Sequence, residues 1–180
     1  MVYMILGTGF EPMEAIAPCD ILRRGGVEVQ LAGIGGTLIE AGHGVRVQAD
    51  CRVEDLKLAS TDMVILPGGI PGTPNLAENK TVTDTCVSFA RAGKKVAAIC
   101  AAPSVLASLG LLEGRNATAH AGFQDKLAGA IVHDEEVVVD GSITTSYGLG
   151  GAIPFALELV RQLAGPAEAD RIQKAIAYRH

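Results

Sequence analysis

Cys100 is the residue of this sequence whose position best suits covalent chemistry. It follows the apolar run Val96–Ile99, which predicts a buried strand, and it precedes a helix expected to begin near Pro103. Proline suits the first helical turn because its missing N–H needs no partner there. A thiol at this junction lies near the positive end of the helix dipole, which favours the thiolate. We therefore expect a nucleophilic Cys100; the alternative is a buried structural cysteine.

The small residues around Cys100 permit a sharp turn that projects its side chain outward, as in the nucleophile elbow of some hydrolytic enzymes. Backbone N–H groups beside such a turn can stabilise the negative oxygen formed when a carbonyl is attacked. The Ala101 N–H is one predicted donor of this oxyanion hole. The second is expected from Gly68 or Gly69, at the end of a neighbouring strand.

Glu14 is the second candidate, in the first turn of a helix expected over residues 13–24. A carboxylate there often interacts only with the helix dipole, and this alternative stays open. In an apolar crevice the pKa of Glu14 would instead rise, so that the carboxyl keeps a proton near neutral pH. It could then hydrogen-bond a thiolate and later act as a general base. Glu11 is a weaker candidate for the same pocket, where we expect it to bind substrate.

His120 follows the helix expected after Cys100, where the chain must return past the same sheet edge. A lone histidine is more often structural than catalytic, so both roles stay open. No histidine pair has metal-ligand spacing, and the other cysteines have neither metal nor disulfide spacing. We therefore expect no metal site and no cofactor, with Cys19, Cys51 and Cys86 behaving as small apolar residues.

Strand and helix patterns alternate along the chain, which predicts one α/β domain over residues 1–180. Its sheet should be mostly parallel, with helices on both faces, and ligands should bind at the carboxyl ends of its strands. Gly7–Glu14, Pro67–Gly72 and Cys100 are all expected at such ends and should share one crevice. The predicted strands are 2–6, 27–34, 63–66 and 96–99, an edge strand at 45–47 and a hairpin around 140–141; the predicted helices are 13–24, 79–92, 103–109, 152–163 and 166–178.

Composition and charge argue against several classes of protein. The net charge is −5 and the pI is near 5.3, with no basic stripe for a nucleic-acid backbone. Gly7 and Gly9 begin a dinucleotide-like pattern, but Pro12 occupies the place of its third glycine. The sequence has no long apolar run and begins directly with a strand, so we expect a cytoplasmic protein without a membrane segment.

Five ordered motifs resemble the ThiJ/PfpI family, in the branch of the parkinsonism-associated deglycase and its bacterial relatives. Each motif alone is weak, but their order along nearly the whole chain makes the resemblance specific. The motifs are Gly9–Ala15, Val64–Gly69, Ala98–Pro103, Thr118–His120 and Thr145–Gly148, the last followed by Phe155–Leu157.

This resemblance implies a flavodoxin-like three-layer sandwich that forms a homodimer. It assigns the nucleophile to Cys100, a protonated glutamate to Glu14 and a nearby histidine to His120. It also assigns the oxyanion donors to Gly69 and Ala101. In relatives an arginine of the first helix reaches the partner's site, and Arg24 is the matching position.

Four positions depart from the patterns of relatives. His43 stands where they often place a second arginine, and Tyr147 and Leu149 differ from the vertebrate branch. Ala101 also replaces the histidine that directly follows the nucleophile in protease-like members. This makes a cysteine protease or amidase the less favoured hypothesis, because no adjacent imidazole can protonate an amine leaving group.

The resemblance implies a cofactor-independent glyoxalase or deglycase that acts on methylglyoxal-type 2-oxoaldehydes or their adducts. The alternative hypothesis is an oxidative-stress sensor or chaperone that uses oxidation of Cys100. A structural or interaction protein without activity is the third possibility. The residues do not identify the physiological substrate or decide between catalysis and redox sensing.

Overall fold

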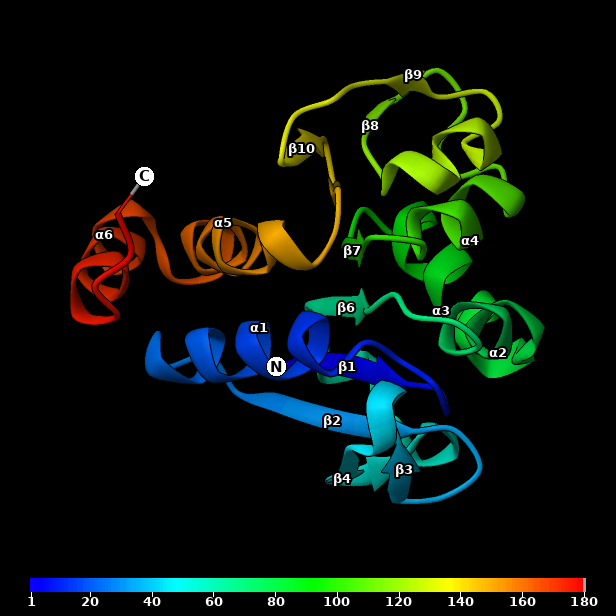
Figure 1. Ribbon diagram of the computed structural model, residues 1–180, viewed down its shortest axis with the longest axis horizontal. Coiled ribbons are helices and arrows are strands. Elements are labelled where there is room, and N and C mark those ends of the chain that lie inside the picture. The colour runs from blue at the N-terminus through cyan, green and yellow to red at the C-terminus, as the bar shows by residue number, and fades with distance from the viewer. Residues whose placement is uncertain (180) are drawn as a thin grey trace.

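The computed structural model describes residues 1–179, and its centre is a seven-stranded sheet (Figure 1). The strand order is β10-β11-β7-β6-β1-β2-β5, and β10 is the strand that runs antiparallel to its neighbour. The predicted domain ends at His180, which lies outside the described residues. The strands are β1 (Val2–Leu6), β2 (Val29–Gly33), β5 (Cys51–Arg52), β6 (Met63–Leu66), β7 (Lys95–Ile99), β10 (Val137–Asp140) and β11 (Ile143–Ser146).

The strands are buried on both faces, which explains why they read as continuous apolar runs rather than as alternating patterns. Along β1, Val2, Met4 and Leu6 join one hydrophobic cluster, whereas Tyr3 and Ile5 join the cluster on the opposite face. The predicted flavodoxin-like three-layer architecture, with a mostly parallel sheet between two layers of helices, is confirmed.

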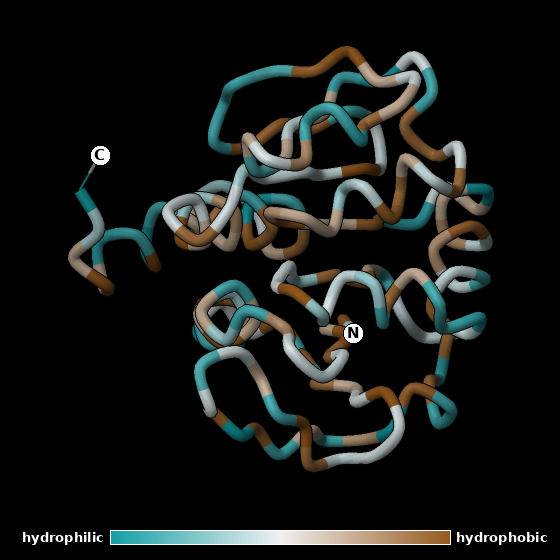
Figure 2. Tube along the Cα trace, turned by 45° about the vertical axis from the view of Figure 1, so that its right-hand side comes forward, coloured by the Kyte–Doolittle hydropathy of each residue, from teal (hydrophilic) through white to brown (hydrophobic). Residues whose placement is uncertain are grey.

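Each face of the sheet has its own layer of helices (Figure 1). The helices of the first face pack through α1 and α5, and α6 lies against α5. Figure 2 shows brown and teal segments alternating along the helical parts of the chain, as expected for helices with one buried side. The first layer contains α1 (Pro12–Arg24), α5 (Ala152–Ala164) and α6 (Pro166–Ala175); the second contains α2 (Gly72–Glu78), α3 (Lys80–Arg91) and α4 (Pro103–Ser108).

Helix α1 has clear signals at both ends. Glu11 is its N-cap and accepts a hydrogen bond from the Met13 N–H, and Pro12 occupies the first turn. Gly25 ends the helix, where a Cβ would lie 3.1 Å from a methyl carbon of Val160 on α5. Close packing of the two helices therefore fixes the direction of α1 and of the carboxyl groups at its start.

Two regions differ from the sequence prediction. The edge strand expected at 45–47 does not join the central sheet. It falls largely within β4 (Arg46–Gln48), which pairs with β3 (Leu38–Glu40) in a separate antiparallel hairpin. Helix α2 was not predicted, because its seven residues include Pro74 and give too short a helical pattern.

A smaller substructure follows α4. It contains β8 (Asn116–Ala117), β9 (Ile131–Val132) and the 3₁₀ segment η4 (Ala121–Lys126). In the part of the chain described here, no helix is long and apolar enough to cross a membrane.

Candidate active site

Cys100 lies directly after β7 and three residues before α4, as the sequence predicts. Its φ is 65°, in the left-handed region that non-glycine residues rarely adopt. The backbone is fixed on both sides: the Cys100 N–H donates to the Ser146 carbonyl at 2.9 Å, and its carbonyl accepts from the His120 N–H at 2.9 Å. Such a conformation costs about 1–3 kcal/mol and persists where the surrounding structure imposes it.

Glu14 reaches this turn from the first turn of α1. Its side chain is 1% exposed, and Oε2 accepts a hydrogen bond from the Gly68 N–H at 3.0 Å. The carboxyl group also forms a side-chain hydrogen bond with Cys100. The carboxyl therefore contacts the thiol directly, beyond any interaction with the helix dipole.

Burial raises the pKa of Glu14 from its usual value of 4.5 to about 7, since the charged carboxylate is poorly hydrated there. The negative charge of Glu11 acts in the same direction, whereas the hydrogen bonds from Cys100 and Gly68 oppose the shift. Near neutral pH, the carboxyl of Glu14 therefore exchanges its proton readily. This agrees with the expectation of a protonated glutamate.

The pKa of the Cys100 thiol is raised, first by burial and then by the negative charge of Glu14. Backbone hydrogen bonds from Ala101 and Gly69 lower this pKa but do not outweigh both effects. The sequence analysis expects a thiolate favoured by the helix dipole, but the pKa of the thiol shifts in the opposite direction because burial and an ionised Glu14 outweigh the backbone donors. The pair shares a proton: the thiolate is favoured when Glu14 is protonated, and the thiol when Glu14 is ionised.

Gly68 occupies the space between the two reactive groups. A Cβ at this position would lie 2.6 Å from Glu14 Oε2 and 2.7 Å from the Cβ of Cys100. Any larger residue would push these groups apart. Glycine at this strand end is therefore required for direct contact between carboxyl and thiol.

The N–H groups of Ala101 and Gly69 both hydrogen-bond the sulfur of Cys100. These are the two donors that the family resemblance assigns to the oxyanion site. Gly68, the other donor considered from the sequence, instead directs its N–H to Glu14. Gly69 has a φ of 95°, which positions its N–H and is strained for residues with a Cβ.

His120 lies next to Cys100 through the backbone pairing described above. Gly148 lies between their side chains: a Cβ there would be 3.6 Å from the His120 ring and 3.8 Å from the Cys100 sulfur. Within residues 1–179, the hydrogen bond of the ring is the one that Nδ1 accepts from the Gly122 N–H at 3.2 Å. A neutral His120 therefore carries its hydrogen on Nε2 and can donate it to a bound molecule.

The remaining predicted residues, Glu11 and Arg24, are not among the hydrogen-bond partners of the sulfur. The Glu11 side chain caps α1, and its backbone N–H donates to the Gly68 carbonyl at 2.9 Å, so it supports the Gly68–Gly69 turn. Arg24 lies at the opposite end of α1, about 15 Å along the helix from Glu14, and pairs with Asp20. Within this chain Arg24 therefore does not contact the site.

Two positions near the sulfur were not identified as site residues from the sequence. The Ser146 carbonyl holds the Cys100 N–H, and Gly148 leaves the sulfur uncovered on one side. Both belong to or directly follow β11, within the Thr145–Gly148 motif. The Thr145–Gly148 motif contains both residues, but their proximity to the sulfur is seen only from the pairing of β11 with β7.

The other three cysteines differ from Cys100 in their surroundings. Cys19 and Cys86 are buried in the cores under the helices, and Cys51 lies on the edge strand β5. Desolvation is the first cause of the raised pKa of each thiol. Within the described residues, none of the three sulfurs accepts hydrogen bonds from backbone N–H groups of two other residues, as the Cys100 sulfur does, so their thiols are expected to be inert.

Comparisons with known proteins identify related sequences over most of the chain. The profile of the DJ-1/PfpI family matches residues 1–162. Protein dj-1beta of Drosophila melanogaster is 36% identical over 176 residues, 96% of this chain and 94% of that protein. Glutathione-independent glyoxalase DJR-1.2 of Caenorhabditis elegans is 34% identical over 168 residues, 92% of this chain and 89% of that protein. Protein DJ-1 homolog A of Arabidopsis thaliana is 36% identical over 99% of this chain, which spans 46% of that longer protein.

Solved structures are similar over the whole fold. The crystal structure of Drosophila melanogaster DJ-1beta gives a TM-score of 0.95 at 34% identity, covering 99% of this chain and 98% of that chain. The structure of oxidized Toxoplasma gondii DJ-1 also gives 0.95, at 32% identity and the same coverage.

Proposed function

Because the chain belongs to the DJ-1/PfpI family, as its motifs predict, we propose that it is a cysteine-dependent glyoxalase or deglycase. Its substrates would be methylglyoxal-type 2-oxoaldehydes or their adducts with amino and thiol groups. The observation that carries this proposal is the hydrogen bond between Glu14 and Cys100, with the N–H groups of Gly69 and Ala101 on the sulfur. The Caenorhabditis elegans relative named as a glutathione-independent glyoxalase supports it.

The first step joins the Cys100 sulfur to the aldehyde carbon. The thiolate forms the C–S bond, and the electron pair of the C=O bond moves to oxygen, where the Ala101 and Gly69 N–H groups stabilise the negative charge. This oxygen takes up the proton of the Glu14 carboxyl, which gives a hemithioacetal and leaves Glu14 as the carboxylate. No electrons are gained or lost by the protein.

The second step moves a proton between the two carbons of the substrate. Glu14 as carboxylate removes the hydrogen of the hemithioacetal carbon, and the electron pair left behind forms an enediol. Return of the proton to the neighbouring carbon gives a 2-hydroxyacyl thioester. Water then cleaves the C–S bond, so that methylglyoxal and water together give lactate and free Cys100. The raised pKa of Glu14 suits a group that must both accept and return a proton near neutral pH.

On an early adduct, the same attack would form the C–S bond at the carbon that carries the modified group. The C–N or C–S bond to that group breaks, and the protonated Glu14 carboxyl gives its proton to the leaving amine or thiol. Glu14 is then the carboxylate that the second step needs, and the rest of the pathway is unchanged. The glyoxalase and deglycase reactions thus form the same hemithioacetal from two different substrates. Neither reaction needs a metal or an added cofactor for its atoms to balance.

The test is lactate formation from methylglyoxal by the purified protein. We expect Cys100→Ala to abolish activity and Glu14→Ala to lower kcat by roughly 10²–10⁴-fold, the usual contribution of a general acid–base. Cys51→Ala is the matched control and should keep wild-type rates. Activity that survives in both Cys100→Ala and Glu14→Ala would refute the proposal.

A second candidate function is oxidative-stress sensing. Cys100 is partly exposed, and a protonated Glu14 could donate a hydrogen bond to an oxidised sulfur. A related structure is described as oxidized. After mild peroxide treatment, intact-mass analysis should then find two added oxygens on Cys100. Oxidation at Cys51 instead would argue against this function.

We further propose that the protein acts as a cytoplasmic homodimer on a small carbonyl substrate. Two apolar side chains on the first half of α1 support an interface there: Met13 is 52% exposed and Ile16 is 37% exposed. In such a dimer Arg24 would approach the partner's site. Light scattering after size-exclusion chromatography tests the assembly, and a monomer at micromolar concentration would contradict it.

A further inference from the structure

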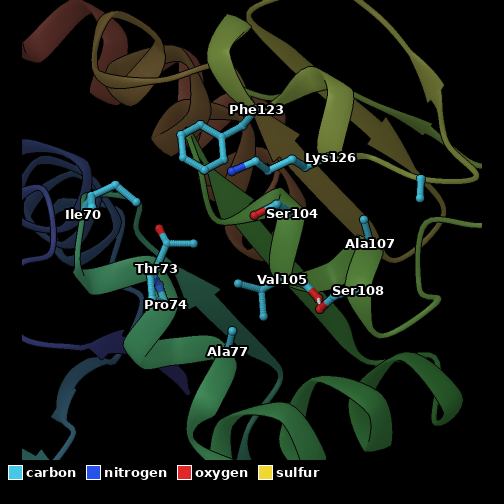
Figure 3. A pocket seen from close by; sticks show the side chains of 11 residues that line it. Ile70, Thr73, Pro74, Ala77, Ser104, Val105, Ala107, Ser108, Phe123 and Lys126 are labelled. Carbon is cyan, nitrogen blue, oxygen red and sulfur yellow. Dashed lines mark hydrogen bonds between the residues drawn. The ribbon is translucent and has the colours of Figure 1, made fainter.

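A groove formed by segments that follow the candidate active-site residues along the chain is much larger than a compound such as methylglyoxal requires. Its volume is about 710 Å³, within the range of sites that bind drug-sized molecules. Figure 3 shows its three walls: residues of α2, residues of α4, and the side chains of Phe123 and Lys126 from η4. The groove therefore has room for a ligand group larger than methyl.

Each wall continues directly from a segment that holds a group of the active site. Helix α2 follows the Gly68–Gly69 turn, α4 follows Cys100, and η4 follows His120. At least one hydrogen bond joins each wall to a site residue. These bonds run from the Thr73 N–H to the Gly69 carbonyl at 2.8 Å, from the Ser104 hydroxyl to the Ala101 carbonyl at 2.6 Å, and from the Phe123 N–H to the His120 carbonyl at 2.7 Å.

The lining of the groove favours an apolar and planar group. Ile70 lies at one end and Val105 lies between the walls in Figure 3. The Lys126 ammonium lies 4.4 Å from the centroid of the Phe123 ring, so one wall offers an aromatic ring together with a cation. The hydroxyls of Ser104 and Ser108 already donate to backbone carbonyls and do not require a polar ligand.

We propose that this groove binds an apolar, preferably aromatic, substituent of the substrate that Cys100 attacks. The inference rests on the proposed function and specifies its substrate class: 2-oxoaldehydes, or their adducts, in which a bulky group replaces the methyl of methylglyoxal. The bonds made and broken are those given above. Phenylglyoxal and water would give mandelate, with the proton moved between carbons by Glu14.

The first experiment compares initial rates of mandelate formation from phenylglyoxal with lactate formation from methylglyoxal. We expect wild-type kcat/KM to favour phenylglyoxal by about tenfold or more, as apolar pockets discriminate by 10–200-fold per group. Ala77 lines the groove and is exposed on α2, so Ala77→Phe fills space without entering the core. Ala77→Phe should lower the ratio of kcat/KM for phenylglyoxal to kcat/KM for methylglyoxal by about tenfold. Ala175→Phe, on the exposed side of α6, is the matched control and should keep the ratio.

Equal kcat/KM values in the wild type, or a ratio unchanged by Ala77→Phe, would overturn the inference even if methylglyoxal is consumed. A second measurement separates it from the proposed function. Acetophenone, which lacks the aldehyde, is titrated into Cys100→Ala protein while backbone amide signals are followed by NMR. Saturable shifts at Ala77 and Val105 without turnover of either aldehyde in the wild type would support the groove and reject the glyoxalase. Absence of shifts would reject the groove.

Discussion

Glu14 and Cys100 are joined by a hydrogen bond between two groups that cannot both be ionised without mutual repulsion. The carboxyl is 1% exposed, and the pKa values of both groups are raised, in each case first by burial. The position of a single proton therefore decides whether Cys100 is a nucleophilic thiolate or Glu14 is a carboxylate base. The first two predictions follow from this proton.

Stability should depend on the titration of Glu14. Its pKa of about 7 in the folded protein exceeds 4.5, so the folded state holds the proton more tightly than the unfolded state. This contribution is fully present below pH 4.5 and is lost as the pH rises to about 7, which amounts to about 3 kcal/mol. Urea unfolding at pH 4.5 and pH 8 measures it. Glu14→Gln, which cannot ionise, should reduce the difference between the two pH values; an unchanged difference would contradict the raised pKa.

The alkylation rate of Cys100 should depend on the charge of Glu14. Replacing Glu14 by Gln removes the negative charge that raises the pKa of the thiol. Iodoacetamide should then react with Cys100 about tenfold faster at pH 8, one unit of pKa being a factor of ten. A slower reaction in Glu14→Gln would mean instead that a protonated Glu14 stabilises the thiolate of the wild type. Mass spectrometry localises the label, and Cys51 serves as the internal reference.

Gly68→Ala should separate the two reactive groups. The new Cβ would lie within 2.7 Å of Glu14 Oε2 and of the Cβ of Cys100, and backbone and helix must move to relieve it. We expect a loss of about 1–3 kcal/mol in unfolding free energy, the usual cost of overpacking, together with loss of turnover. Gly36→Ala is the control, since nothing lies within 4 Å of its Cβ. Normal activity in Gly68→Ala would show that direct contact of carboxyl and thiol is unnecessary.

Gly148→Ala tests access to the sulfur. Its Cβ would lie 3.8 Å from the sulfur and 3.6 Å from the His120 ring, ordinary contacts that cover the thiol without a clash. The φ of 149° also strains any residue other than glycine. Gly165→Ala shares this backbone strain, at φ 94°, but has nothing within 4 Å. Both variants should lose about 1 kcal/mol of stability. Only Gly148→Ala should raise KM for the aldehyde. A similar KM in both variants would contradict the role of Gly148 in keeping the sulfur accessible.

Thr73→Val should stabilise the protein. The Thr73 hydroxyl is buried and has no hydrogen-bond partner among the described residues, and valine keeps its shape. Removing an unpaired hydroxyl should add about 1 kcal/mol to the unfolding free energy. Thr85→Val is the matched control, because the Thr85 hydroxyl donates to the Thr81 carbonyl at 2.6 Å and its loss should destabilise. Equal changes in Tm for both variants would contradict the assignment.

Much of the fold follows from local patterns. The apolar runs at 63–66 and 96–99 and the helical spacing after Met13 predict elements whose bounds agree with the structure within about two residues. The seven-residue helix α2 has too few turns to show periodicity, and β8 and β9 have two residues each. The separation of the β3–β4 hairpin from the main sheet depends on tertiary pairing, which no local pattern encodes.

The sequence could identify the residues of the candidate site, but not the direction in which the pKa of the Cys100 thiol is shifted. Cys100 is marked by its strand-to-helix junction and Glu14 by its place at the start of a helix near the same sheet edge. The direction of the thiol pKa depends on the distance between these side chains, and so on strand order. The assignment of the Gly68 N–H to Glu14 and of the Gly69 N–H to the sulfur likewise depends on the backbone geometry of one turn.

The strand order also has a consequence for how the protein acquires its reactivity. Glu14, Gly68 and Cys100 follow β1, β6 and β7, three adjacent parallel strands whose segments are far apart in the sequence. Contacts of such long range form slowly, because long loops must close before they stabilise the chain. The paired thiol and carboxyl can therefore come together only when the centre of the sheet is complete. The alkylation rate of Cys100 should therefore change to its native value only when this part of the sheet has formed. Pulse labelling at successive times of refolding would measure that step at the residue that catalysis would use.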